Sequence, residues 1–246
     1  QNLIMKLIKH AKNIHELKIK GTHAKIAMLS DLHWDNPKCD WKLLKKDLDY
    51  CVKESIPIMV NGDMFCLMQG QGDRRKNKSD IRPEHNNSKY LDSIVETAVE
   101  WWSPYSHLLT VIGYGNHETA IIKWQETDIL SRFVKLLNLK NHTNVQVGGY
   151  GGWFIVNQIL KESPLGKPST KSMKVRYEDF DVFSMGHIHE NAARNDARDS
   201  IVQGQDAYRQ VQRQIHMMIT GTYKEEYGDG SKGWHVERGA PIKPVG

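Results

Sequence analysis

Four short apolar runs in this chain each end in a cluster of residues whose side chains can bind a metal ion. Each run has the length of a buried strand: residues 24–29, 57–60, 107–112 and 179–185. The clusters that follow them are Asp31 with His33, Gly62 with Asp63, the run Gly115-Asn116-His117-Glu118, and Gly186-His187 with His189. Functional sites in open α/β sheets form at the carboxyl ends of the strands. We therefore predict that the four clusters meet at one point.

The segments between these runs predict helices and loops. Helical spacing of apolar residues predicts helices over 41–54, 90–102 and 126–139, and the first would bury one face formed by Leu43, Leu44, Leu48, Cys51 and Val52. Residues 69–89 and 113–118 are predicted to be loops, and 144–160 to be strands interrupted by a glycine-rich turn. The alternation of strands and helices favours an α/β fold, and 246 residues suit a single domain over 1–246.

The charge of the chain allows a phosphate-bearing substrate without requiring one. Thirty-four Lys and Arg against 29 Asp and Glu give a formal net charge of +5. A mild positive balance would help an anionic substrate to approach. A solvated basic surface is the simpler interpretation, and the balance is too small to indicate nucleic-acid binding.

The cysteines and the hydropathy of the chain indicate the cellular compartment in which the protein is expected. Cys39, Cys51 and Cys66 form no C-x-x-C pair and are odd in number, so a disulfide framework is not expected and a reducing compartment is favoured. No apolar run approaches the length of a membrane span, and the start of the sequence does not read as a secretion signal. We expect a cytoplasmic protein without a membrane partner.

The mixture of carboxylate, amide and imidazole groups suits hydrolysis of a phosphoester by a dinuclear metal centre. Two divalent cations about 3.5–4 Å apart can activate a water and hold the phosphoryl oxygens. This ligand set is compatible with Mn, Fe, Zn or Ni. Each cluster alone has an ordinary interpretation as surface, turn or solvated strand. Four of them in order at strand ends favour the metal centre.

The order of the motifs resembles the calcineurin-like metallophosphoesterase superfamily, whose signature is D-x-H, G-D, G-N-H-[DE] and G-H-x-H. The match runs over roughly residues 24–190, and residues 79–85 and 220–239 are similar to phage and bacterial members. The resemblance implies a two-layer β-sandwich flanked by helices. It implies that Asp31, His33 and His189 hold one metal, that Asp63 bridges, and that Asn116 and His187 hold the second. His117 would lie outside the metal shell and stabilise the transition state or protonate the leaving oxygen, while a metal-bound hydroxide attacks phosphorus.

One part of the family pattern is missing. The family places a further metal-binding His between the third and fourth motifs, before a glycine-rich turn, and the only His in that interval is His142, which comes too early. Three hypotheses account for this: a segment of the natural chain is absent from the sequence, the second metal site is depleted, or catalysis has been lost and the fold is kept for binding.

The sequence therefore predicts a phosphoesterase that hydrolyses phosphomonoesters or phosphodiesters with two divalent metal ions, manganese being favoured. A nuclease is the alternative within the enzyme class. A catalytically impaired binding or structural protein of the same fold is the alternative outside it.

Overall fold

The structure is a computed structural model that describes residues 5–20, 25–68, 78–159, 182–185, 192–203 and 208–219, together with Tyr223. Its strands form three sheets. The central sheet is parallel and contains, in spatial order, β3 (Ala27–Leu29), β4 (Ile58–Val60), β5 (Leu109–Ile112) and β6 (Gln146–Val147). The strands predicted over 24–29, 57–60 and 107–112 are confirmed in shorter form. Because these strands are parallel, the clusters that follow them lie at the same edge of the sheet.

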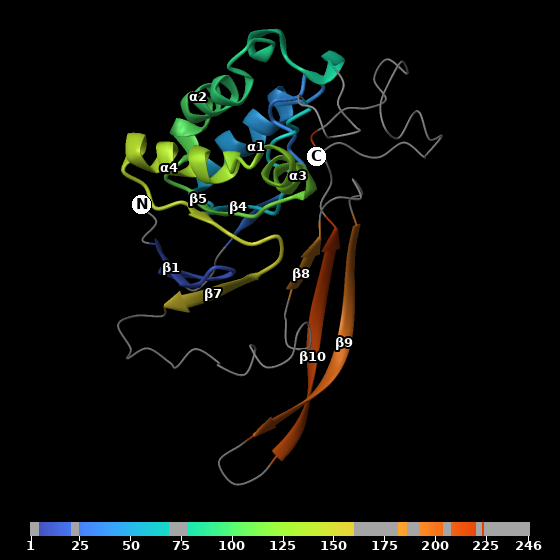
Figure 1. The fold of residues 1–246 in the computed structure, drawn as a ribbon. Helices are drawn as coiled ribbons and strands as arrows, with labels where there is room; N and C mark the ends of the chain where they lie inside the picture. The colour runs from blue at the N-terminus through green and yellow to red at the C-terminus, as the bar shows by residue number, and fades with distance from the viewer. Residues whose placement is uncertain are drawn as a thin grey trace.

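Within the described residues, four α-helices accompany this sheet and lie on one side of it in Figure 1. They are α1 (Trp41–Glu54), α2 (Tyr90–Trp102), α3 (Asn116–Gln125) and α4 (Ile129–Asn141). The carboxylate of Asp40 begins α1 by accepting from the backbone nitrogen of Leu43 at 2.9 Å, and Asp128 begins α4 in the same way. The predicted bounds of α1 and α2 are confirmed.

The predicted buried face of α1 is wrong at one residue. Leu44, Leu48 and Cys51 are buried, but Val52 is 39% exposed and Leu43 is half-buried. Val52 follows Cys51 directly, so it lies about 100° further round the helix and leaves the narrow stripe that faces the sheet.

The loop predicted over residues 113–118 is confirmed for 113–115 and wrong for the rest, because α3 begins at Asn116. The side chain of Glu118 turns back and accepts from the backbone nitrogen of Gly115 at 2.8 Å, which stabilises the first helical turn. Glu126 then ends α3 with a left-handed backbone, and α4 starts at Ile129 rather than at 126.

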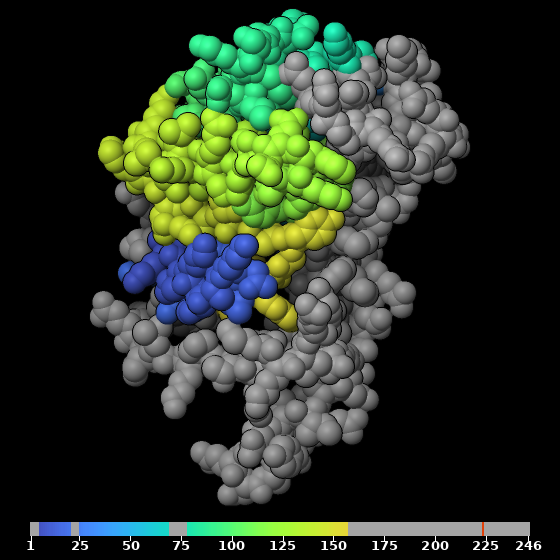
Figure 2. All heavy atoms as spheres, viewed as in Figure 1, coloured from blue at the N-terminus to red at the C-terminus, as the bar shows by residue number. Residues whose placement is uncertain are grey.

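A second sheet, of order β1-β2-β7, was not expected at the N-terminal end of the sequence. The antiparallel hairpin of β1 (Met5–Ala11) and β2 (Ile14–Lys20) pairs through β2 with the parallel strand β7 (Trp153–Ile159). In Figure 1 this sheet lies beyond the central sheet, on the side away from the helices. Figure 2 shows the blue hairpin below the yellow-green helices on one face of the molecule. The helices, the central sheet and the second sheet thus form three layers in that order.

The third sheet has the order β8-β10-β9. It contains β8 (Val182–Met185), β9 (Ala192–Gln203) and β10 (Tyr208–Ile219). β8 confirms the last four residues of the strand predicted over 179–185. β9 and β10 pair antiparallel along all twelve residues and form the long ribbon in Figure 1.

The polar segment 69–89 contains three-residue 3₁₀ helices in its second half, η1 (Lys78–Asp80) and η2 (Pro83–His85); a further one, η3 (Ser103–Tyr105), extends the end of α2. Residues 69–77 lie outside the described part of the chain. Within the described ranges, no helix combines the length and the apolar character that a membrane span needs.

Candidate metal centre

The loops that follow β3 and β4 are tied to each other through their backbones. Asp31 donates its backbone N–H to the carbonyl of Gly62 at 3.2 Å, and His33 donates to the carbonyl of Asp63 at 3.1 Å. A third bond runs from Trp34 to Met64 at 2.9 Å. The first two predicted clusters are therefore held side by side beyond the ends of their strands.

Three of the predicted ligands have a left-handed backbone. The φ angles of Asp31, His33 and Asp63 are 51°, 46° and 48°. Few residues other than glycine adopt this region, and such strained positions concentrate at functional sites. The hydrogen bonds between the two loops hold the backbone in this conformation. The extended backbone of each strand therefore ends before the candidate ligands.

Two glycines allow the second and third clusters to touch. Gly62 has a φ of +83°, and a Cβ there would lie 3.0 Å from the Cα of Gly115. A Cβ on Gly115 would lie 2.0 Å from Oδ1 of Asp63 and 2.5 Å from its carboxyl carbon. The start of α3 thus forms a cradle for the Asp63 carboxylate that only glycine leaves open.

The first turn of α3 holds this carboxylate with its backbone. The N–H of His117 donates to Oδ1 of Asp63 at 3.0 Å, where the positive end of the helix dipole also favours an anion. Glu118 is buried and accepts from the backbone nitrogens of Phe65 at 2.9 Å and of Gly115 at 2.8 Å. Burial first, and then the neighbouring Asp63 carboxylate, raise the pKa of Glu118 above its usual range.

The tautomer of His117 follows from its hydrogen bond. Nδ1 lies 2.6 Å from the backbone carbonyl of Cys66, which can only accept, so Nδ1 carries the proton. Nε2 is therefore the atom that can accept a proton or bind a ligand in the neutral ring. The ring lies edge-on to that of His33, with 4.8 Å between the centroids.

Asp31, His33 and Asp63 form a group that fits a divalent cation. All three are buried, and one ligand atom from each lies within 4.8 Å of the others. Two carboxylates and an imidazole are a ligand set that suits a cation such as Mn²⁺, and the cradle at Gly115 fixes one of the carboxylates. Asn116, the first residue of α3, is half-buried and precedes His117, whose backbone N–H donates to Asp63.

His187 and His189, and residues 160–181 where the family has its further His, lie outside the described residues. His142 ends α4 with a φ of 54°, which gives it a structural role at a helix terminus.

The sequence did not single out Asp35 and Cys66, which contact each other. Oδ1 of Asp35 accepts from the backbone nitrogen of Cys66 at 2.5 Å, and Oδ2 accepts from that of Leu67 at 2.9 Å. Asp35 belongs to the polar run Ser30–Asp35 and Cys66 follows Asp63 closely, so both lay next to recognised motifs.

Tyr223 was also missed, and it supports the same edge from a distant part of the chain. Its backbone N–H donates to the carbonyl of Asp31 at 3.3 Å, and its carbonyl accepts from Asp40 at 2.8 Å. Its hydroxyl donates to Asp47 at 2.9 Å. No local signal in the sequence indicates these contacts.

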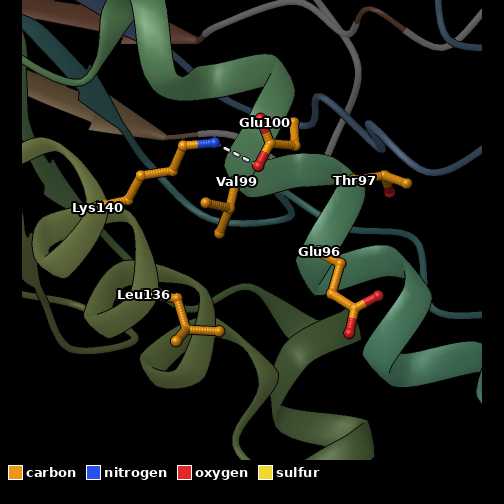
Figure 3. A pocket seen from close by; sticks show the side chains of 6 residues that line it. All are labelled: Glu96, Thr97, Val99, Glu100, Leu136 and Lys140. Atoms are coloured by element: carbon orange, nitrogen blue, oxygen red, sulfur yellow. Dashed lines mark hydrogen bonds and ion pairs between the residues drawn. The ribbon is translucent and has the colours of Figure 1, made fainter.

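A surface hollow lies between α2 and α4, away from the predicted ligands. It is lined by Glu96, Thr97, Val99, Glu100, Leu136 and Lys140. Figure 3 shows Lys140 reaching across it to form an ion pair with Glu100. None of the described residues of the motifs lines this hollow.

Comparisons of this chain with protein-family models, with curated proteins and with solved structures found no match. The metallophosphoesterase family and the calcineurin-like fold therefore stay predictions that rest on the four motifs.

Proposed function

We propose that this protein is a metal-dependent phosphoesterase whose centre lies at the carboxyl edge of the central sheet. The observation that carries the proposal is the position of Asp63. Its carboxylate lies in the glycine cradle of Gly115, accepts from the N–H of His117, and belongs to one ligand group with Asp31 and His33. A carboxylate so fixed is suited to bridging two cations.

Asp31, His33 and Asp63 would hold one divalent cation, and Asp63 and Asn116 would reach the second. His187 and His189 complete the set on the strength of the family resemblance. Bound divalent cations would lower the pKa of a water molecule and offset the negative charge of a phosphoryl group. Manganese is the proposed metal.

The chain's own contribution to the reaction would come from His117. Its Nδ1–H is engaged by the carbonyl of Cys66, which fixes the orientation of the ring and leaves Nε2 for substrate. A protonated Nε2 can donate to a phosphoryl oxygen or to the leaving oxygen. Phosphomonoesters and phosphodiesters are both proposed substrates.

The test is hydrolysis of bis(p-nitrophenyl) phosphate and of p-nitrophenyl phosphate by the purified protein supplied with Mn²⁺. Asp63→Asn is the informative variant, because Asn tolerates a left-handed backbone and still accepts from the N–H of His117. We expect it to lower both bound manganese and turnover by about 100-fold or more. Asp92→Asn changes an exposed carboxylate paired with Arg132 and should keep both.

Absence of turnover with each of Mn, Ni, Zn and Fe would refute the proposal that the protein is a phosphoesterase. A protein that nevertheless bound metal would then be a binding protein. Equal activity of Asp63→Asn and wild type would show that hydrolysis occurs elsewhere.

A further inference from the structure

We propose that Cys66, His33 and His117 form a second, soft-metal site that takes zinc and shares one residue with the centre proposed above. The three side chains are buried, and one ligand atom from each lies within 4.8 Å of the others. The existence of this site does not depend on the phosphoesterase activity. Its effect on hydrolysis, described below, rests on the proposed function.

The three side chains are close enough to converge on one ion. Ligand atoms on a tetrahedral zinc with one sulfur and two nitrogens lie about 3.5 Å apart. One ligand atom from each of the three residues lies within 4.8 Å of the others, so binding one ion would require them to move closer together. His117 offers Nε2, because Nδ1 is held by the carbonyl of Cys66.

Hydrogen bonds hold Cys66 in a fixed position. The side-chain amide of Asn36 donates to Sγ at 3.1 Å, which fixes the position of the sulfur. The backbone nitrogen of Cys66 is held by Asp35. On metal binding the thiol proton would pass to solvent.

The two ligand groups select different cations. Thiolate with two imidazoles favours zinc or cadmium, whereas Asp31 and Asp63 favour a harder ion such as manganese. His33 belongs to both groups, so a zinc ion at Cys66 would compete for that imidazole. It would also occupy Nε2 of His117, and we infer that zinc there inhibits the manganese-dependent reaction.

The test is titration of the metal-free full chain with Cd²⁺, followed by the ultraviolet thiolate-to-cadmium charge-transfer absorption. We expect one equivalent to produce the band in wild type and in Cys39→Ser, a control at another cysteine. Cys66→Ser should lose the band, and His117→Gln should weaken cadmium binding at least tenfold. Asp31→Asn should keep the band, because Asp31 belongs only to the other group.

Absence of the band in wild type, or its persistence in Cys66→Ser, would overturn the site. Circular dichroism and thermal melting of each variant exclude unfolding as the cause of a lost band, and Cys66→Ala provides a second replacement.

Zinc inhibition is then measured as the ratio of activity with and without Zn²⁺ within each variant. We expect Cys66→Ser to be inhibited less by zinc than wild type, and Cys39→Ser to be inhibited as wild type is. Equal inhibition of the two variants would refute the regulatory effect. If the chain hydrolyses nothing, the cadmium band still decides whether the site exists.

Discussion

A methyl group on Gly115 would lie 2.0 Å from Oδ1 of Asp63 and 2.3 Å from its backbone nitrogen. Neither atom can move freely. Oδ1 accepts from the N–H of His117, and the backbone carbonyl of Asp63 accepts a hydrogen bond from the N–H of His33. We therefore expect Gly115→Ala to lower the free energy of unfolding by about 3 kcal/mol and to reduce manganese binding. Chemical denaturation and metal analysis measure the two effects.

Gly151 provides the matched control, because a Cβ there meets nothing within 4 Å. Gly151→Ala should leave stability within about 0.5 kcal/mol and metal content unchanged. If the two alanine variants behaved alike, the cradle around Asp63 would have no energetic importance.

His117 is expected to act on substrate rather than on manganese. Its Nδ1–H is bound to the carbonyl of Cys66, and it does not belong to the group of Asp31, His33 and Asp63. His117→Ala should lower kcat by about 100- to 1,000-fold while bound manganese stays near the wild-type amount. Kinetics and metal analysis on the same preparation test this. Loss of manganese together with activity would make His117 a ligand and contradict the assigned role.

Asp35 is expected to stabilise the loop that follows Asp63. Both its oxygens accept backbone N–H groups, those of Cys66 and Leu67, in a buried setting. Asp35→Asn turns an amide NH₂ toward one of these donors and leaves a buried N–H without an acceptor. The free energy of unfolding should fall by about 2 kcal/mol in urea denaturation.

Asp92→Asn is again the comparison, since it alters an exposed ion pair worth about 0.5 kcal/mol. A loss for Asp35→Asn no larger than for Asp92→Asn would show that the two backbone bonds contribute little.

His85 should make the protein less stable at mildly acidic pH. Thr97 donates its hydroxyl to the carbonyl of Ser93 at 2.7 Å, so Nε2 of His85 must be the donor in its 2.9 Å bond to Thr97. Its Nδ1 is then unprotonated, and it is buried without a hydrogen-bond partner among the described residues. Burial lowers the pKa of His85 below its ordinary 6.5; Arg82 acts in the same direction, and the Asp35 and Glu84 carboxylates oppose it.

A lowered pKa means that the unfolded chain takes up this proton first as the pH falls. The free energy of unfolding is then unaffected well above pH 6.5 and declines as the pH drops through about 6.5. His85→Gln keeps a donor toward Thr97 and cannot be charged. Its Tm should fall less than that of wild type between about pH 7.5 and 5.5. His107→Gln, at an exposed histidine, should retain the wild-type slope, and equal slopes for His85→Gln and wild type would contradict the prediction.

The parts of the fold that could be predicted are those whose signals are local. α1 and α2 have apolar spacing within their own residues, Ser103-Pro104 directly follows α2, and both helices were predicted at the right bounds. α3 was missed although Gly115 and Glu118 have the spacing of a capping box, because the motif was interpreted only as a ligand loop. The hairpin of β1 and β2 was missed because polar residues are buried in it: Glu16 is 2% exposed and accepts from His10 at 2.8 Å.

The candidate centre, like the fold, has features that the sequence predicts and features that it does not. Its residue types and their positions after strands follow from the sequence, since parallel strands bring their carboxyl ends together. The left-handed backbone at Asp31 and His33 does not, because hydrogen bonds to a loop thirty residues away impose it. The proximity of Cys66 to His33 and His117, from which the soft-metal site follows, likewise depends on tertiary packing.

The bond between Tyr223 and Asp31 links the centre to the order in which the ribosome makes the chain. Synthesis proceeds from the N-terminus, so Asp31, Asp63 and Asn116 all emerge before Tyr223 does. A nascent chain that already contains the central sheet lacks the backbone donor to Asp31 and the acceptor for Asp40. The edge of the sheet is therefore complete only after residue 223 has left the ribosome, and premature termination before that point would yield a polypeptide with the ligands but without their support.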